Sequence, residues 1–308
     1  MNNVFRAIAV TAGLTLSLAA FASDYPSKNI RLIVPFGAGG GTDAVGRALA
    51  SSAKDVLGKN ITIVNRSGGA GAVGMSLGAQ QRADGYTLTV ITREIASLPQ
   101  MGLMRHDMHD FKLIRMVNLD PVVVLVSADS PYNSINDLVK AARENEGRIK
   151  FASTAAPNFY LMALEKHQRV KFNAIPYNGA SEALPSVLGK HTEVTIVTPG
   201  EAISQLRSGQ LKTLGVMSEE RVNFLPDVPT LREQGIDVVT GTWRGIGAPK
   251  DTPEDVIRNL GKAFDQAMTS PDFISFMEQG AMTIHNLDTK AFTQFVEQDT
   301  QTLGELIN

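Results

Sequence analysis

The stretch at residues 31–47, RLIVPFGAGGGTDAVGR, decides how the chain is organised around its candidate site. Residues 32–34 form a short apolar run of strand type, and Pro35 ends strand pairing because proline has no backbone N–H. Four glycines follow, and Thr42 or Asp43 can cap the helix after them. A strand, a glycine turn and a helix N-terminus bring free N–H groups and the positive end of a helix dipole together. The stretch therefore predicts an anion cradle that needs no lysine or arginine.

A second copy of this arrangement follows directly. Residues 61–64 have strand character, residues 67–71 read SGGAG, and residues 72–82 have the pattern of a helix. Residues 86–92 (YTLTVIT) predict a third strand. Two glycine loops on adjacent strands predict a cleft that receives a carboxylate.

Length and composition restrict the class of protein. A chain of 308 residues suits two ordinary domains, and 43% hydrophobic with 19% charged residues is typical of a globular protein. The formal net charge is −2 without a basic block, so nothing indicates nucleic-acid binding. The absence of cysteine excludes disulfides, thiolate metal sites and cysteine nucleophiles.

The N-terminus has the pattern of a secretory signal peptide. Arg6 precedes an apolar segment at residues 8–21, and Ala20-Phe21-Ala22 fits the small-x-small cleavage rule. The segment is shorter than the ~20 residues that span a bilayer. We expect cleavage after Ala22 and an exported protein, and an uncleaved anchor helix is the alternative.

The rest of the chain alternates strands with helices, which predicts parallel sheets with crossover connections and a ligand site beyond the carboxyl ends of the strands. Residues 111–117 and 122–126 are expected to be separate strands divided by Asp120-Pro121, and residues 93–108 to be irregular. The segment from residue 253 onwards is mainly helical. No low-complexity linker is present, so a domain boundary must run through strands.

The motifs of the chain resemble those of one family, the periplasmic substrate-binding proteins of tripartite tricarboxylate transporters (the Bug or TctC family). The pattern P-F-x-x-G-G-x-x-D occurs at residues 35–43, and N-R-x-G-x-x-G-x-x-G at residues 65–74. Residues 83–88 resemble P-D-G-Y-T-L with alanine in place of proline. Residues 225–235 and Trp243-x-Gly245 resemble the late signature. Ala38 stands where proline is common, and residues 155–160 replace the usual Gly-x-Gly-Ser/Thr turn of the second lobe.

The resemblance implies a fold of the periplasmic binding protein type II kind, an α/β protein with two lobes. Each lobe is expected to hold a mainly parallel sheet flanked by helices. The expected domains are a signal peptide at residues 1–22, lobe 1 at residues 23–122 plus 243–308, and lobe 2 at residues 123–242. We expect a hinge with two crossings, near residues 122–127 and 239–242. No cofactor, metal site or catalysis is expected.

The implied function is capture of a small carboxylate between the lobes and its delivery to integral membrane transporter subunits. Di- and tricarboxylates, acidic amino acids and aromatic acids all remain open as the ligand, and the protein is expected to be a monomer. Arg93 is a candidate partner for a second anionic group, with plain solvation as the alternative. The candidate ligand contacts are Phe36, Gly39, Gly40, Gly41, Thr42, Asp43, Gly69, Ala70, Gly71, Thr92, Arg93, Ser153, Thr154, Asn158 and Thr198.

Other motifs leave alternatives open. Gly37-x-Gly39-x-x-Thr42 is close to a dinucleotide fingerprint, and Arg66 at the end of the second strand would suit the 2′-phosphate of NADP. Residues 74–78 match the esterase pattern G-x-S-x-G, although Ser76 is expected inside a helix. Residues 69–76 fit a P-loop except that Met75 replaces the lysine, which discards that reading. His106 and His109 lack a third metal ligand nearby, and Trp243 is expected to be a packing residue near the hinge.

Overall fold

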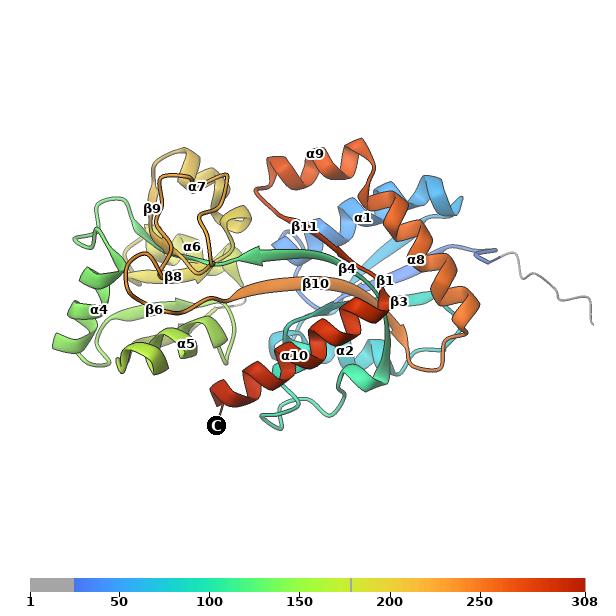
Figure 1. Ribbon diagram of the computed structural model, residues 1–308, viewed down its shortest axis with the longest axis horizontal. Coiled ribbons are helices and arrows are strands. Elements are labelled where there is room, and N and C mark those ends of the chain that lie inside the picture. Colours follow the sequence, from blue (N-terminus) through green and yellow to red (C-terminus); the bar gives the residue numbers. More distant parts are fainter. Residues whose placement is uncertain (1–24, 178, 308) are drawn as a thin grey trace, which may run out of the picture.

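The structure, a computed structural model, describes residues 25–177 and 179–307, and the predicted signal peptide lies outside these residues. The strands of the described residues form two sheets, one of six strands and one of five. Each sheet is covered by helices, and the two lobes lie side by side along the long axis of the molecule (Figure 1). The predicted two-lobe α/β architecture is confirmed.

The six-stranded sheet has the order β11-β4-β10-β3-β1-β2. Its strands are β1 (Ile30–Val34), β2 (Ile61–Asn65), β3 (Thr87–Thr92), β4 (Phe111–Pro121), β10 (Gly241–Pro249) and β11 (Ile284–Leu287). Its helices are α1 (Gly41–Leu57), η1 (Gly69–Gly71), α2 (Ala72–Ala79), α3 (Glu94–Ser97), η2 (Met108–Asp110), α8 (Glu254–Met268), α9 (Pro271–Gln279) and α10 (Thr289–Ile307). Residues 94–97, expected to be irregular, thus form a short helix.

The five-stranded sheet has the order β7-β6-β8-β5-β9. Its strands are β5 (Val123–Ser127), β6 (Lys150–Ser153), β7 (Asn173–Pro176), β8 (Val194–Val197) and β9 (Leu211–Val216). Its helices are α4 (Ile135–Glu144), α5 (Phe159–Gln168), α6 (Ala180–Leu188), η3 (Pro199–Ala202) and α7 (Ile203–Arg207). Ser134 caps α4 as expected, because its side chain accepts a hydrogen bond from the N–H of Asp137.

Both sheets are mixed rather than mainly parallel. β1 pairs in parallel with β2 and β3, and β6 pairs in parallel with β7 and β8. The strands that come from the crossing region run the other way: β10 is antiparallel to β3 and β4, and β5 is antiparallel to β8 and β9. Alternation of strands and helices in the sequence signals crossovers but gives no signal for these returning strands.

The chain passes between the sheets along β4 and β10. These strands pair over their whole length, from Phe111 with Pro249 to Pro121 with Gly241, and run side by side in Figure 1. The expected break at Asp120-Pro121 is wrong, because β4 continues through both residues to its end. β5 begins two residues later in the other sheet, at Val123. The change of sheet therefore occurs at Val122.

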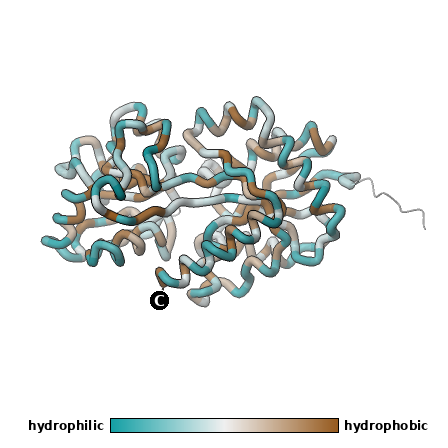
Figure 2. Tube along the Cα trace, viewed as in Figure 1, coloured by the Kyte–Doolittle hydropathy of each residue, from teal (hydrophilic) through white to brown (hydrophobic). Residues whose placement is uncertain are grey.

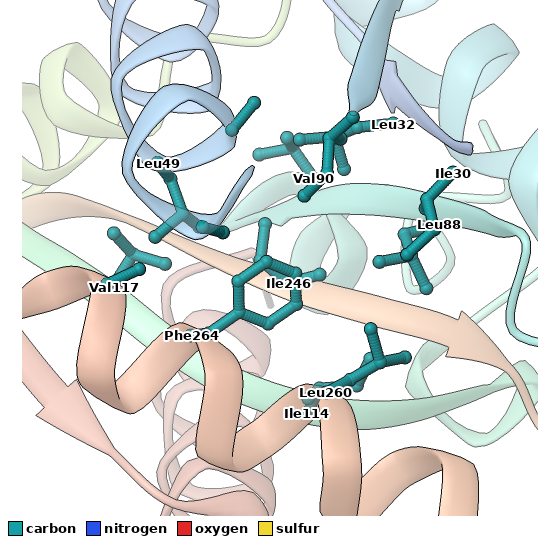
Figure 3. Packing of buried hydrophobic residues seen from close by; sticks show 14 of the residues in the cluster. Ile30, Leu32, Leu49, Leu88, Val90, Ile114, Val117, Ile246, Leu260 and Phe264 are labelled. Atoms are coloured by element: carbon teal, nitrogen blue, oxygen red, sulfur yellow. The ribbon is translucent and has the colours of Figure 1, made fainter. Parts of the chain in front are cut away.

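Amphipathic helices close the core of the six-stranded sheet. Leu49 of α1 and Phe264 of α8 meet Val90 and Ile246 of the sheet (Figure 3), and all four side chains are buried. Burial of such a side chain stabilises the fold by about 1.5–3 kcal/mol. Hydrophobic and hydrophilic residues alternate along α10 (Figure 2), which buries one stripe of its surface. This packing fixes the loops that follow β1 and β3.

Candidate functional site

The first glycine loop is held in place by Asp43 and Asn65. The carboxylate of Asp43 accepts hydrogen bonds from Gly39 N–H (2.9 Å), from Arg47 Nε (2.8 Å) and from Asn65 Nδ2 (2.8 Å). Asn65 Nδ2 also donates to Phe36 O (3.0 Å). Burial acts to raise the pKa of Asp43, but the hydrogen bonds from Arg47, Gly39 and Asn65 outweigh it and lower the pKa below its ordinary value. Asp43 therefore fixes the loop as an ionised acceptor.

The N-cap of α1 is Gly40, rather than Thr42 or Asp43. Glycine has no side chain that could accept a hydrogen bond from the first turn, and the first N–H groups of a helix have no partner within the helix. The backbone of Gly40 is extended, with φ −82°. The start of this 17-residue helix is therefore open to an acceptor from outside, at the positive end of the helix dipole.

A cavity of about 120 Å³ lies at this point between the lobes. Its walls come from the first glycine loop, the end of β3, the change of sheet at Val122, the turn before α5, the start of α6, the start of η3 and β10. Nine of the predicted contact residues line it: Phe36, Gly40, Gly41, Thr42, Thr92, Arg93, Thr154, Asn158 and Thr198.

The other predicted contacts lie outside this lining: Gly39, Asp43, Gly69, Ala70, Gly71 and Ser153. The second glycine loop lies behind Phe36, since a Cβ placed on Gly71 would lie 3.2 Å from Phe36 Cζ. The Ser153 hydroxyl donates to Ala155 O and so braces its own turn. These residues support the residues that line the cavity but do not line it themselves.

Arg244 is a lining residue that the sequence reasoning missed. Only 3% of it is exposed. Its Nε donates to Thr42 Oγ1 (3.0 Å), and its Nη1 donates to Asp120 Oδ2 (3.0 Å) and Asn118 Oδ1 (3.3 Å). A Cβ on Gly41 would lie 3.0 Å from Arg244 Nη2, so glycine at this position lets the guanidinium reach the start of α1. The motif Trp243-x-Gly245 was the available signal, because Arg244 is its central residue.

Arg93 is neither solvated nor free to serve as an unpaired cation. Nε and Nη2 both donate to the carboxylate of Asp299 on α10, at 2.9–3.3 Å. Nη1 donates to Gly241 O (3.1 Å) and to the hydroxyl of Thr240. Although Arg93 lines the cavity, its three nitrogens are committed to α10 and to the crossing strand. Trp243 is buried as expected, and its Nε1 donates to Asp299 (2.8 Å).

Glu94 is another lining residue that was not among the predicted contacts. In the described residues, six buried side-chain polar atoms have no hydrogen-bond partner, and three of these atoms belong to residues that line this cavity. The three are Thr92 Oγ1, Glu94 Oε2 and Asn158 Nδ2. The Thr92 hydroxyl nonetheless lies close enough to the Glu94 carboxyl to act on its pKa as a hydrogen-bond donor, so Asn158 Nδ2 is the lining donor left without a partner in the described residues.

The lobes contact each other beside the cavity at two places. Phe159 of α5 is buried in a cluster with Ile91, Trp243 and other residues of the opposite lobe, and Lys166 Nζ donates to Glu305 O (2.9 Å) of α10. On η3, a Cβ at Gly200 would lie 2.4 Å from Gly280 O. The two lobes therefore share buried apolar surface outside the cavity as well as the residues that line it.

The remaining motifs have structural explanations. Ser76 lies inside α2 rather than at a strand-to-helix turn, and Gly74 and Gly78 allow α2 to approach Pro35 and Thr89 closely. His106 Nδ1 pairs with Asp110 Oδ2 (2.9 Å). No group of three or more His, Cys, Asp or Glu side chains in residues 25–177 and 179–307 is placed to hold a metal ion. Over the same residues, no helix combines the length and apolar content needed to cross a membrane.

Two lobes that change sheet at a pair of crossing strands, with a lined cavity and an open helix N-terminus between them, define a solute-binding protein. A family comparison matches residues 45–308 to TctC, the tripartite tricarboxylate transporter family receptor. Protein BugT of Bordetella pertussis is 30% identical over 297 residues, which cover 92% of this chain and 90% of BugT. The chain belongs to the TctC family and is a periplasmic solute-binding protein of that family, as its motifs predicted.

Solved structures agree. A TctC solute binding protein from Polaromonas, without ligand, is 34% identical with a TM-score of 0.73, over 92% of this chain and 99% of that one. The periplasmic binding protein BugD is 29% identical with a TM-score of 0.85, over 92% and 97%. Two R. palustris proteins share the fold. One, with adipate, is 23% identical with a TM-score of 0.87, over 92% of this chain and 97% of that one. The other, MatC with bound malate, is 22% identical with a TM-score of 0.86, over 92% and 100%.

Proposed function

We propose that the protein captures a small carboxylate between its lobes and delivers it to the membrane subunits of a tripartite tricarboxylate-type transporter. The observation that carries this proposal is the open N-terminus of α1 at Gly40, which faces a cavity lined by both lobes beside the Arg244 guanidinium. Adipate and malate in two proteins of the same fold support a carboxylate as the ligand class. In this proposal the protein performs no chemical step, and its localisation is periplasmic after cleavage behind Ala22.

The cradle holds the carboxylate mainly through neutral dipoles. N–H groups at the start of α1, the Thr42 hydroxyl and the Asn158 amide each contribute about 1.5–3 kcal/mol when the acceptor is charged. Both arginines of the lining have carboxylate partners, Asp120 and Asp299, so the cavity does not carry a large net positive charge. A ligand held this way is bound by several hydrogen bonds that opening of the lobes removes together.

Closure couples the ligand to the shape of the protein. In this proposal the lobes are residues 23–122 plus 243–308 and residues 123–242, and they turn about residues 122–127 and 239–242. A ligand that contacts both lobes favours the closed form by as much as its affinity differs between the closed and open forms. The transporter then distinguishes loaded from empty protein by shape.

A thermal-shift screen with confirmation by calorimetry tests the proposal. The panel is malate, succinate, adipate, citrate, aspartate and benzoate, with NADPH and an ester substrate as separate arms. We expect at least one carboxylate to raise the melting temperature by mass action and to bind with 1:1 stoichiometry. Stabilisation by NADPH alone, or ester hydrolysis that is lost in Ser76→Ala, would overturn the proposal in favour of the corresponding enzyme.

A further inference from the structure

Glu94 introduces a carboxyl group into a cavity that is built to hold an anion. It is the first residue of α3, two residues after the end of β3 at Thr92, and it lines the cavity beside the Thr92 hydroxyl. On the opposite lobe, Asn158 lines the cavity and its Nδ2 has no hydrogen-bond partner in the described residues. The cavity is therefore lined by a carboxyl group from lobe 1 and by an amide side chain from lobe 2.

The charged groups around Glu94 are already engaged with other partners. Arg93 is paired with Asp299 of α10, and Arg244 of β10 is paired with Asp120 of β4. Glu201 of η3 uses its Oε2 to accept from the N–H and the hydroxyl of Thr198.

Tyr160 of α5 is the remaining ionisable neighbour. Burial and the nearby Glu94 carboxyl raise its pKa, so it stays neutral. No histidine is among the described residues that line the cavity. Glu94 is therefore the carboxyl group whose protonation state we expect to respond to the anion.

A ligand carboxylate and an ionised Glu94 would repel each other in a cavity of about 120 Å³. Two carboxyl groups that share a buried site cannot both ionise easily, and one of them keeps its proton. The ligand carboxylate lies at the start of α1, where N–H groups and the helix dipole favour its charged form. The proton therefore belongs on Glu94.

We propose that Glu94 binds the ligand as a neutral carboxylic acid, donating its O–H to an anionic oxygen of the ligand. It thereby selects acids with a second acceptor group over acids that carry an ammonium group. This inference rests on the proposed function and adds the specificity of its site. Independently of the geometry, burial raises the pKa of Glu94 above its ordinary value, while the hydrogen bond from Thr92 and the charges of Arg93 and Arg244 act in the opposite direction.

The consequence is uptake of a proton with the ligand whenever Glu94 is ionised in the empty protein. Affinity then falls with rising pH above the pKa of Glu94, by up to about tenfold per pH unit. Over about pH 6.5–9 the mono- and dicarboxylic acids of the panel are almost fully ionised, so their own titration contributes little; citrate, whose third carboxyl group titrates at the lower end of this range, is left out of this test.

The test is calorimetry from pH 6.5 to 9 with the most tightly bound carboxylate of the panel, in the full-length mature protein. Glu94→Gln keeps a neutral donor at this position, whereas Glu94→Ala removes it. We expect Glu94→Gln to bind within about threefold of the wild type at pH 6.5 and to lose any dependence on pH, and Glu94→Ala to bind at least about tenfold more weakly. Glu201→Gln is the matched control, because it removes the other glutamate that lines the cavity; its affinity should keep the wild-type dependence on pH.

Malate and aspartate form a second matched pair, because they differ by a hydroxyl against an ammonium group. The inference is overturned if Glu94→Gln is as weak as Glu94→Ala, if Glu94→Ala binds normally, or if wild-type affinity rises with pH. A wild-type preference for aspartate that Glu94→Gln abolishes would also overturn it, since that preference requires an ionised Glu94. If no carboxylate binds wild type or Glu94→Gln at any pH, the proposed function itself fails; binding without these Glu94 effects overturns only the inference.

Discussion

Replacing Gly40 by aspartate should separate ligand affinity from stability, because the two are expected to move in opposite directions. Gly40 is the N-cap of α1, its φ of −82° is accessible to any residue, and the nearest atom to an added Cβ is Gly37 O at 3.7 Å. An aspartate at an N-cap accepts hydrogen bonds from the first helical turn and complements the helix dipole. We expect the variant to be more stable by about 0.5–1 kcal/mol, which raises the melting temperature by about 1–3 °C.

The same carboxylate competes with the ligand for the start of α1. Two unit charges about 6 Å apart at an effective dielectric constant of about 20 repel each other by about 3 kcal/mol, a factor of about 100 in affinity. Loss of an N–H hydrogen bond to the charged ligand adds about 1.5–3 kcal/mol. We therefore expect Gly40→Asp to weaken carboxylate binding at least about 100-fold, not by steric block but by supplying the anion from the chain itself.

Calorimetry and thermal unfolding on the same preparations measure both effects. Gly40→Ala is the steric control and should bind within about threefold of the wild type, while Gly40→Asn occupies the same N–H groups without charge and should fall between the two. If Gly40→Asp bound carboxylates with wild-type affinity, the proposed anion cradle at the start of α1 would be refuted. A melting temperature that falls by several degrees together with the affinity would show that the loop had collapsed, and would refute the assignment of Gly40 as an open cap.

Three further substitutions test the paired arginines and the contact between the lobes. Arg93→Ala should lower the free energy of unfolding by about 2–4 kcal/mol in urea denaturation, because Asp299 loses its cation. It should weaken the binding of mono- and dicarboxylates equally, and a selective loss of dicarboxylate binding would contradict the pairing of Arg93 with Asp299. Phe159→Ala should raise the radius of gyration of the ligand-free protein in X-ray scattering, because Phe159 anchors its lobe in the other; an unchanged radius would argue against that anchor. Arg244→Met should cost about 3–5 kcal/mol by leaving Asp120 buried and unpaired, and adding Asp120→Asn should recover part of the stability without restoring binding. Burial raises the pKa of Asp120 and the guanidinium opposes this rise, so Arg244→Met should become more stable as pH falls from about 8 to about 5; a flat pH profile would refute the pairing.

Local features of the site could be predicted because they depend on neighbouring residues. A proline, a run of glycines and an aspartate after an apolar strand indicate a loop that leads into a helix, and the loop is found there. Asn65 joins this loop because β1 and β2 pair in parallel, with Val34 opposite Asn65. Adjacent parallel strands bring their ends together, so two motifs 22 residues apart meet through a hydrogen bond between Asn65 and Asp43.

Features set by distant partners could not be predicted. β10 has the sequence GTWRGIGAP, in which repeated glycines hide the strand pattern. The glycines are explained only by their neighbours in space: a Cβ on Gly245 would lie 2.4 Å from Phe292 of α10, and a Cβ on Gly247 would lie 2.8 Å from Ile91. Because β10 was not predicted, neither was the position of Arg244 on it.

The partners of the two arginines also connect the cavity to the change of sheet at Val122, where we propose a hinge. Arg244 joins Thr42 at the start of α1 to Asp120, which is two residues from the change of sheet at Val122, and Asp120 also accepts from Thr283 N–H (2.8 Å). A carboxylate at the start of α1 therefore adds an acceptor beside a guanidinium that already holds the crossing strand. Gly41 lies close to both Arg244 and the Glu201 side chain of the opposite lobe. Both groups meet at one glycine, so in the proposed function closure would complete the cradle and bring the second lobe against it in the same movement; ligand binding and lobe closure would then depend on the same few contacts.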